Sequence, residues 1–292
     1  MDESLRLAER FEEHRPHLRS VAYRMLGSLS EADDALQEAW LRASRADTGA
    51  VENMGGWLTT VVGRVCLNVL RSREQRREDP LDAQGPDPVV EPGNAPEDEA
   101  VLADSVGVAL LVVLDRLTPA ERLAFVLHDM FAVPFDEIGA MLDRSPAAVR
   151  QLASRGRRRV TGAGPAPDAD VRRRRGVVDA FLAATRGGSF EALVSLLHPD
   201  VVLRADPAVA RTAGPVVVRG AEAVASGAMA ATGRARSTGV ALVDGAVGLA
   251  MAPRGRLFLV LTFTIADELI TGIEVVADPE RLGGMEIAVP DA

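Results

Sequence analysis

The stretch FDEIGAMLDRSPAAVRQLASRGRRRV, residues 135–160, has the pattern of one helix, a short turn and a second helix. Phe135, Ile138 and Met141 or Leu142 recur at helical spacing, and Pro146 after the turn 143–145 can begin the next helix. In a helix-turn-helix the second helix enters the major groove of DNA. The pattern therefore predicts a DNA-binding segment.

The second helix carries side chains that suit the reading of bases. Arg pairs bidentately with guanine and Gln with adenine, which fits Arg150 and Gln151; Ser154 and Arg155 follow one turn later. The continuous arginines 157–159, with Arg158 at the centre, suit phosphate contacts. The alternative for this run is a solvated helix end whose cations favour the negative pole of the helix dipole.

Upstream of this motif the sequence predicts two more helices. One runs through the apolar stretch 106–114, and the next begins at Thr118-Pro119-Ala120-Glu121, a Thr cap with Pro in the first turn and Glu at the third position. Leu123, Val126, Leu127 and Met130 give the second helix its predicted buried stripe.

An acidic block, SEADDALQEAWLRA, lies about a hundred residues earlier, at 30–43. We expect Ser30 to cap its helix, with Asp33 near the positive end of the dipole. Asp34 and Glu38 lie one turn apart, and this like-charge pair costs a few tenths of a kcal/mol in an isolated helix. A basic protein partner would offset that cost.

The helix predicted at 57–77 has an apolar face and a basic one, and the glycines 55–56 before it are predicted to be flexible. Its basic face carries these residues: Arg64, Asn68, Arg71, Arg73, Arg76 and Arg77. A basic face beside a mobile loop suits a DNA strand separated from its complement. The alternative is an ordinary amphipathic helix.

Composition limits the remaining possibilities. The net charge of −9 means that DNA binding must come from local basic patches, and all 33 basic residues are arginine. The single cysteine, Cys66, excludes an intramolecular disulfide and a cysteine-cluster metal site. His14 and His17 share a predicted helix face without a visible third ligand, so we expect no metal and no cofactor. No apolar run approaches the ~20 residues of a membrane span, and we expect a cytoplasmic protein.

The expected domain organisation follows from changes in composition. Residues 78–104 contain nine acids, five prolines and no basic residue, which is typical of a linker. Two interpretations of this linker stay open: it is a solvated spacer, or its acids cover basic DNA-binding surface. The expected parts are as follows: a first helical domain at 1–77, this linker, a second helical domain at 105–161, a short linker at 162–170, an α+β domain at 171–285 and a tail at 286–292.

The α+β domain is predicted from two helices (172–186 and 189–197), strands at 201–203 and 216–218, a third helix near 221–232 and two hairpins, around 244–245 and 266–268. Helices on a curved antiparallel sheet are expected. His198, Asp206 and Glu274 are the candidates for an inward acid or base, but His198 is expected to cap a helix end and Asp206 to lie in a turn. The apolar strand 257–265 favours packing, dimerisation or an apolar ligand over catalysis, so we expect no enzyme.

Three stretches carry a resemblance to a known family. AYRMLGS from Ala22, SEADDALQEAW and WLTTVVGRVCLNVLRSREQRR resemble region 2 of sigma-70-family factors, and LTPAERLAFVLHDMF with the helix-turn-helix resembles region 4. No region 3 is recognisable, which is typical of the extracytoplasmic-function (ECF) group. The C-terminal part resembles the SnoaL-like branch of the cone-shaped, nuclear-transport-factor-2-like fold, which tunes sigma activity in cis in a known subgroup.

The resemblance implies partners and sites. By similarity, Asp34, Gln37 and Glu38 would dock on the clamp coiled coil of the largest subunit of core RNA polymerase. The loop 47–56, including Asn53, with Arg64, Asn68 and Arg71 would bind the −10 element of promoter DNA. Arg150, Gln151, Ser154, Arg155 and Arg158 would bind at the −35 element. The C-terminal domain would contact the helical domains. Two other classes stay open: a helix-turn-helix regulator with a small-molecule-sensing domain, and a SnoaL-like enzyme fused to a DNA-binding arm.

Overall fold

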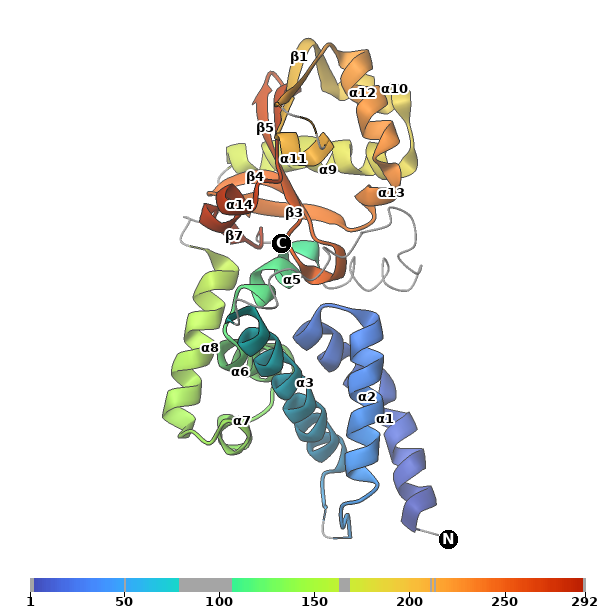
Figure 1. The fold of residues 1–292 in the computed structure, drawn as a ribbon, viewed down its shortest axis with the longest axis vertical. Helices are drawn as coiled ribbons and strands as arrows, with labels where there is room; N and C mark the ends of the chain where they lie inside the picture. Colours follow the sequence, from blue (N-terminus) through green and yellow to red (C-terminus); the bar gives the residue numbers. More distant parts are fainter. Residues whose placement is uncertain are drawn as a thin grey trace. The chain divides into compact units, whose positions relative to one another are not determined.

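The computed structural model describes residues 3–49, 51–78, 107–162, 169–210, 212 and 214–290. These residues form two compact units (Figure 1). The helical unit contains the described residues up to 78 together with 114–158, and the sheet unit contains 107–113 and the described residues from 159 onward. The expected linker at 78–104 lies outside the described residues except for its first position. None of the described helices is long and apolar enough to span a membrane.

Three long helices begin the helical unit: α1 Glu3–Leu26, α2 Leu29–Ala43 and α3 Met54–Glu78. Each turns an apolar stripe towards the other two. In α2 this stripe consists of Leu29, Ala32, Ala35, Leu36, Ala39 and Ala43, all buried. The small alanines allow the helices to approach closely, and the larger side chains of the neighbouring helices fill the core around them.

Two details of these helix starts differ from expectation. The N-cap of α2 is Ser28 and not Ser30, which lies inside the helix. Helix α3 begins at Met54, so Gly55 belongs to its first turn and not to a flexible segment before it. The side chain of Asn53 accepts a hydrogen bond from the Gly56 N–H at 3.0 Å and so caps this end.

The rest of the helical unit has the expected order of elements: α6 Pro119–Phe125, the π-helical turn η1 Val126–Met130, α7 Phe135–Leu142 and α8 Pro146–Thr161, whose last three residues belong to the sheet unit. The Thr118 capping box is confirmed, since its hydroxyl accepts from the Glu121 N–H and its own N–H donates to the Glu121 carboxylate, both at 3.3 Å. Met130 is half-buried and not part of the buried stripe.

The turn between α7 and α8 depends on a close backbone approach. Asp143 has a left-handed conformation (φ 55°), and the Arg144 N–H donates to the carbonyl of Gly139 at 3.0 Å. A Cβ atom at position 139 would lie 2.7 Å from the carbonyl oxygen of Arg144. Glycine at this position therefore permits the tight turn that holds α7 and α8 together.

The sheet unit is a mixed seven-stranded sheet with helices on both faces. Its strands are β1 Leu197–Ala205, β2 Val216–Arg219, β3 Thr238–Val243, β4 Ala246–Met251, β5 Leu259–Ala266, β6 Leu269–Val276 and β7 Ile287–Ala288, in the order β2-β1-β6-β5-β4-β3-β7. Its helices are α5 Val108–Asp115, α9 Ala169–Gly187, α10 Phe190–Leu196, α11 Pro207–Ala210, α12 Ala221–Ala230, α13 Thr232–Ala235, the 3₁₀ turn η2 Pro253–Gly255 and α14 Pro279–Gly284.

The two predicted hairpins are confirmed. Asp244-Gly245 joins β3 to β4 and Asp267-Glu268 joins β5 to β6, each with two positive φ angles. The sheet is not wholly antiparallel, because β1 pairs with β6 in parallel. A parallel pair needs a long crossover, and no local turn signal in the sequence announces it.

Each face of the sheet has its own core. On one face, side chains of α9, α10 and α12 meet those of β1 and β4–β6, among them Val178, Phe181, Leu193 and Ile273. On the other face, α5 and α14 cover Ala241, Val243, Ala250, Val260 and Val276. The first core forms the interior of the cone-like domain.

Candidate polymerase-binding and DNA-binding surfaces

Helix α2 separates its acidic residues into two groups. Glu31 forms an ion pair with Arg73 of α3, and Asp33 accepts two hydrogen bonds of 2.8 Å from the guanidinium of Arg19 in α1. These two carboxylates hold the helices together, and Asp33 does not serve the dipole of its own helix as expected.

The other group of polar residues faces outward. Asp34, Gln37 and Glu38 are exposed, and the ion pair of 2.8 Å from Glu38 to Arg42 lies within the same helix. Exposed pairs at i, i+4 contribute only about 0.3–0.5 kcal/mol, so this contact is easily exchanged for one with a partner. All three predicted polymerase-binding residues thus lie on one accessible face.

The same face includes an apolar residue that sequence reasoning missed. Leu41, one turn after Gln37, is 48% exposed. It borders a groove of about 340 Å³ between α1 and α2, which Phe11, Trp40 and Gln37 also line. An apolar side chain at the spacing Asp34, Gln37, Leu41 is the signal that could have identified it.

Helix α3 presents the predicted −10 residues on one side. Arg64, Asn68 and Arg71 are exposed at helical spacing. Arg73 does not belong to this basic face, because it is half-buried against Glu31 and donates to the carbonyl of Leu26. The side chains of residues 76 and 77 lie outside the described residues.

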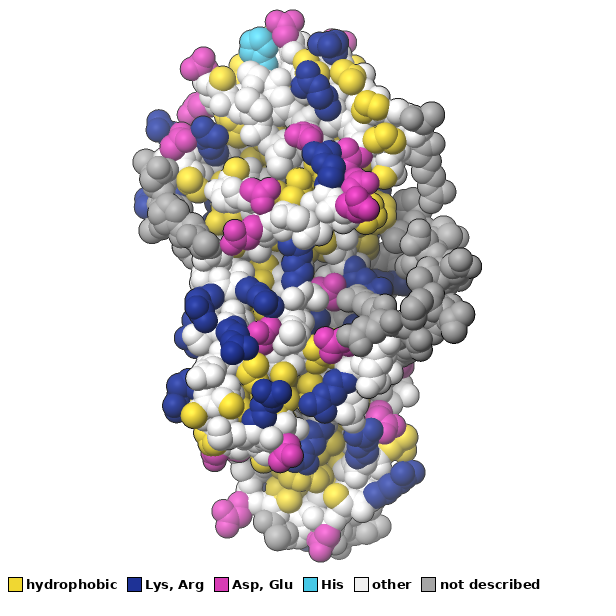
Figure 2. Space-filling model, turned by 60° about the vertical axis from the view of Figure 1, so that its left-hand side comes forward, with side chains coloured by type: hydrophobic (Ala, Val, Ile, Leu, Met, Phe, Trp, Pro, Cys, Tyr) yellow, Lys and Arg dark blue, Asp and Glu magenta, His cyan; other side chains and the backbone are white. Residues whose placement is uncertain are grey.

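Helix α8 separates a buried face from a polar one. Val149, Leu152, Ala153 and Gly156 pack inward. The predicted DNA-binding residues of this helix lie on the other side: Arg150, Gln151, Arg155 and Arg158 are exposed and Ser154 is half-buried. Figure 2 turns the α8 side of the molecule forward and shows basic side chains gathered there.

Two arginines of this region have local partners. The guanidinium of Arg150 lies 5.2 Å from the ring centre of Phe135 in α7, a cation–π contact that orients it. Arg157 forms an ion pair with Asp129 and so is held at the surface of its own unit. The run 157–159 is therefore divided between an internal contact and outward-facing charge.

Inside the helical unit, α6 and η1 pack on α1 and α3. Arg122 is buried and donates to the carbonyl of Arg24 at 3.2 and 3.3 Å. Burial lowers the pKa of Arg122 to about 10, while Asp115 at 3.7 Å favours its charged form. A Cβ atom at Gly63 would lie 3.2 Å from Leu127, which shows how closely these helices approach.

The sheet unit binds both ends of the predicted second helical domain. Val108, Ala109, Val112 and Val113 of α5 are buried on the outer face of the sheet, where a Cβ atom at Gly239 would lie 2.8 Å from that of Val108. At the other end, the carbonyl of Val160 in α8 accepts a hydrogen bond of 2.9 Å from the Val289 N–H. Helix α5 thus shares a core with the sheet.

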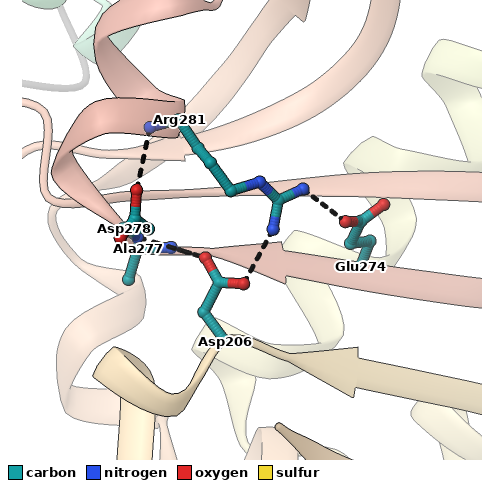
Figure 3. A network of polar contacts seen from close by, with 5 residues as sticks. All are labelled: Asp206, Glu274, Ala277, Asp278 and Arg281. Atoms are coloured by element: carbon teal, nitrogen blue, oxygen red, sulfur yellow. Dashed lines mark hydrogen bonds and ion pairs between the residues drawn. The ribbon is translucent and has the colours of Figure 1, made fainter.

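A polar network fixes the C-terminal segment that makes these contacts (Figure 3). Arg281 of α14 donates to Asp206, after β1, and to Glu274 of β6, both at 2.7 Å. Asp206 also accepts from the N–H groups of Ala277 and Asp278 at 3.1 Å. Although desolvation opposes it, these backbone donors and the Arg281 guanidinium lower the pKa of the Asp206 carboxyl. Asp206 is therefore an anchor between segments and not a simple turn residue.

None of the three catalytic candidates lines the cone interior within the described chain. Glu274 lies on the exposed side of β6, between the inward-facing Ile273 and Val275. His198 lies in β1 and not at a helix end, and its Nδ1 accepts from the Asp200 N–H at 3.1 Å. With the anchoring role of Asp206, none of these three side chains is placed as an acid or base for a substrate inside the cone.

The histidines of α1 have structural neighbours. His17 contacts the hydroxyl of Thr59 at 3.3 Å and packs edge-on against Phe131. Burial, followed by the nearby His14, lowers the pKa of His17. No cluster of three metal-ligating side chains occurs among the residues that the structure describes.

Comparisons with known proteins identify the family. Residues 10–77 match the family model for sigma-70 region 2, and residues 107–160 match that for sigma-70 region 4. The ECF RNA polymerase sigma factor SigJ of Mycobacterium tuberculosis strain H37Rv is 39% identical over 94% of this chain and 92% of its own length. The probable ECF sigma factor SigI of M. tuberculosis strain CDC 1551 is 37% identical over 64% of this chain and 66% of its own.

The crystal structure of M. tuberculosis SigJ is similar to 95% of this chain and 98% of its own, at 32% identity and a TM-score of 0.44. The chain belongs to the ECF sigma factors of the sigma-70 family. It is an alternative sigma factor with helical sigma regions followed by an α+β domain.

Proposed function

We propose that this sigma factor docks on the clamp coiled coil of core RNA polymerase through Asp34, Gln37 and Glu38. The observation that carries the proposal is the division of charge on α2. Its inward acids are neutralised by arginines of the same unit, whereas these three residues face outward beside the exposed Leu41. An apolar anchor with a polar rim is the usual composition of a protein interface.

The test is the affinity for core polymerase of the full chain carrying D34R/E38R. We expect at least a tenfold loss, about 1.4 kcal/mol, because two attractive contacts become repulsive. The matched control is E9R/E13R on α1, which reverses two exposed acids at the same spacing. Equal affinity of the two variants would contradict the proposed docking face.

Promoter recognition is proposed for the two basic faces. Arg64, Asn68 and Arg71 of α3, with Asn53 at its cap, bind the −10 element. The −35 element is bound by α8 through these residues: Arg150, Gln151, Ser154, Arg155 and Arg158. Support comes from the exposure of all of these residues except Ser154, which is half-buried. The proposed domains are 1–77, 105–161 and 171–285, with the segments between and after them as linkers and tail.

Control of activity in cis is proposed for the sheet unit. Support comes from its contacts with α5, which precedes the helix-turn-helix in the chain, and with the end of α8, the second helix of that motif. The chain itself performs no catalysis in this proposal, and it works in the cytoplasm with the polymerase. Gly239→Ala, whose added methyl group would crowd Val108 of α5, is expected to change promoter-specific transcription while core affinity stays constant. Unchanged transcription would contradict control through α5.

A further inference from the structure

The sheet unit carries a basic surface that the sigma regions do not account for. Four consecutive arginines, 172–175, occupy the first two turns of α9. Arg172, Arg173 and Arg174 are exposed, and Arg175 is half-buried. Asp170 forms an ion pair of 2.8 Å with Arg174, and Asp179 forms one of 3.5 Å with Arg175, so residues 169–179 carry four arginines against two acids. The N-terminal part of α9 is therefore locally positive in a chain of net charge −9.

Folding of the domain does not explain this run. The core side chains of α9 are apolar: Val178, Phe181 and Leu182 are buried, and Val171 and Val177, on either side of the arginines, pack partly buried against the same core. A Cβ atom at Gly176 would meet nothing within 4 Å, so the helix surface there is open. Cations in the first turns of a helix also oppose its dipole, so the arginines do not stabilise the helix that carries them.

The short connection between α8 and α9 limits how far this surface can lie from α8, the helix proposed to bind the −35 element. Helix α8 ends at Thr161 and α9 begins at Ala169, eight peptide steps later. At ~3.3–3.6 Å per residue these steps span at most about 26–29 Å, which is less than one turn of duplex DNA at ~34–36 Å. Arg159 and Val160 of α8 also belong to the same compact unit as α9.

We infer that residues 172–174 form a second, sequence-independent contact with duplex DNA, made with backbone phosphates next to the −35 element. Planar guanidinium groups bind phosphate oxygens in a bidentate manner, and such contacts position a protein without reading bases. This inference rests on the proposed binding of α8 to the −35 element. It assigns the sheet unit a direct part in holding the promoter.

The test compares promoter binding by holoenzymes containing the wild-type chain, R173Q/R174Q and the charge-preserving R173K/R174K. Each lost phosphate contact lowers the slope of log affinity against log salt by about 0.9, so the Gln variant should lose about 1.8. At 0.15 M salt this corresponds to roughly 30-fold weaker binding. Because phosphates carry no sequence information, the loss should be equal on promoter DNA and on DNA with a scrambled −35 element. The Lys variant should keep most of the affinity.

The matched control is R234Q/R236Q, which removes two exposed arginines elsewhere on the sheet unit and should leave affinity and slope unchanged. An unchanged salt slope for R173Q/R174Q would overturn the inference. A loss that appears instead in the affinity for core polymerase would overturn it in favour of a protein contact. Failure of the proposed function would look different, because the wild-type holoenzyme itself would not discriminate promoter from scrambled DNA.

Discussion

The contact between α5 and the sheet can be tested by a single methyl group at Gly239. In this structure a Cβ atom at that position would lie 2.8 Å from the Cβ of Val108 and 3.2 Å from its Cγ2. Carbon atoms in contact prefer about 3.5–4.0 Å, so Gly239→Ala must displace α5 by roughly 0.7–1.2 Å or strain the strand. Overpacking of this kind costs about 1–3 kcal/mol, partly offset by the ~0.5–1 kcal/mol that alanine gains over glycine in a strand.

Hydrogen exchange of the α5 amides measures this displacement directly. A net loss of 1–2 kcal/mol in the local opening free energy accelerates exchange about 5–30-fold at residues 108–115. The matched control is Gly227→Ala in α12, where the added methyl meets nothing within 4 Å and should stabilise that helix slightly. If the α5 amides exchange at the same rate in both variants, α5 does not depend on its site on the sheet, and the reasoning is refuted.

Three further predictions concern the −10 segment, the Asp206 network and the packing of Gly63. The segment 47–56 has no aromatic residue to stack an extruded base, a contact worth ~1–3 kcal/mol elsewhere, so transcription should fall sharply with single changes in the −10 element. Broad tolerance in a promoter series would contradict this. The pKa of Asp206 is lowered in the folded state, so its contribution to stability is present above the unfolded value of 3.8 and is lost as the pH falls through the folded pKa. Arg281→Met removes one cause of the lowered pKa and should make acid unfolding below about pH 4 less steep. An unchanged unfolding curve would argue against the network. Gly63→Leu should crowd Leu127 and lower the free energy of unfolding by about 1–3 kcal/mol, which lowers the melting temperature by roughly 2–4 °C per kcal/mol. An unaltered melting temperature would show that these helices separate easily.

Local signals in the sequence were sufficient for much of the fold. The Thr118 capping box, the helix-turn-helix and the Asp244-Gly245 hairpin were predicted because each depends on residues close together in the chain. Family membership was recognisable for the same reason. The exposure of Arg64 and Arg150 also followed from helical periodicity alone.

Contacts between distant segments could not be predicted in this way. The parallel pairing of β1 with β6 and the burial of α5 on the sheet depend on long-range packing that no local pattern encodes. The same limit applies to charges: Arg73 was expected to face DNA, but it pairs with Glu31, 42 residues away. Surplus charge on a helix can be assigned to a partner only when its internal partners are known.

The central claim, that this chain directs core polymerase to particular promoters, is tested most directly by transcription in vitro. Purified core polymerase is supplied with a promoter library and the full chain, and the RNA 5′ ends are sequenced. We expect discrete start sites that share −35 and −10 elements and that disappear with the D34R/E38R variant. Specific DNA binding by the chain without polymerase, together with no discrete start sites, would contradict this claim and would indicate a helix-turn-helix regulator of another kind.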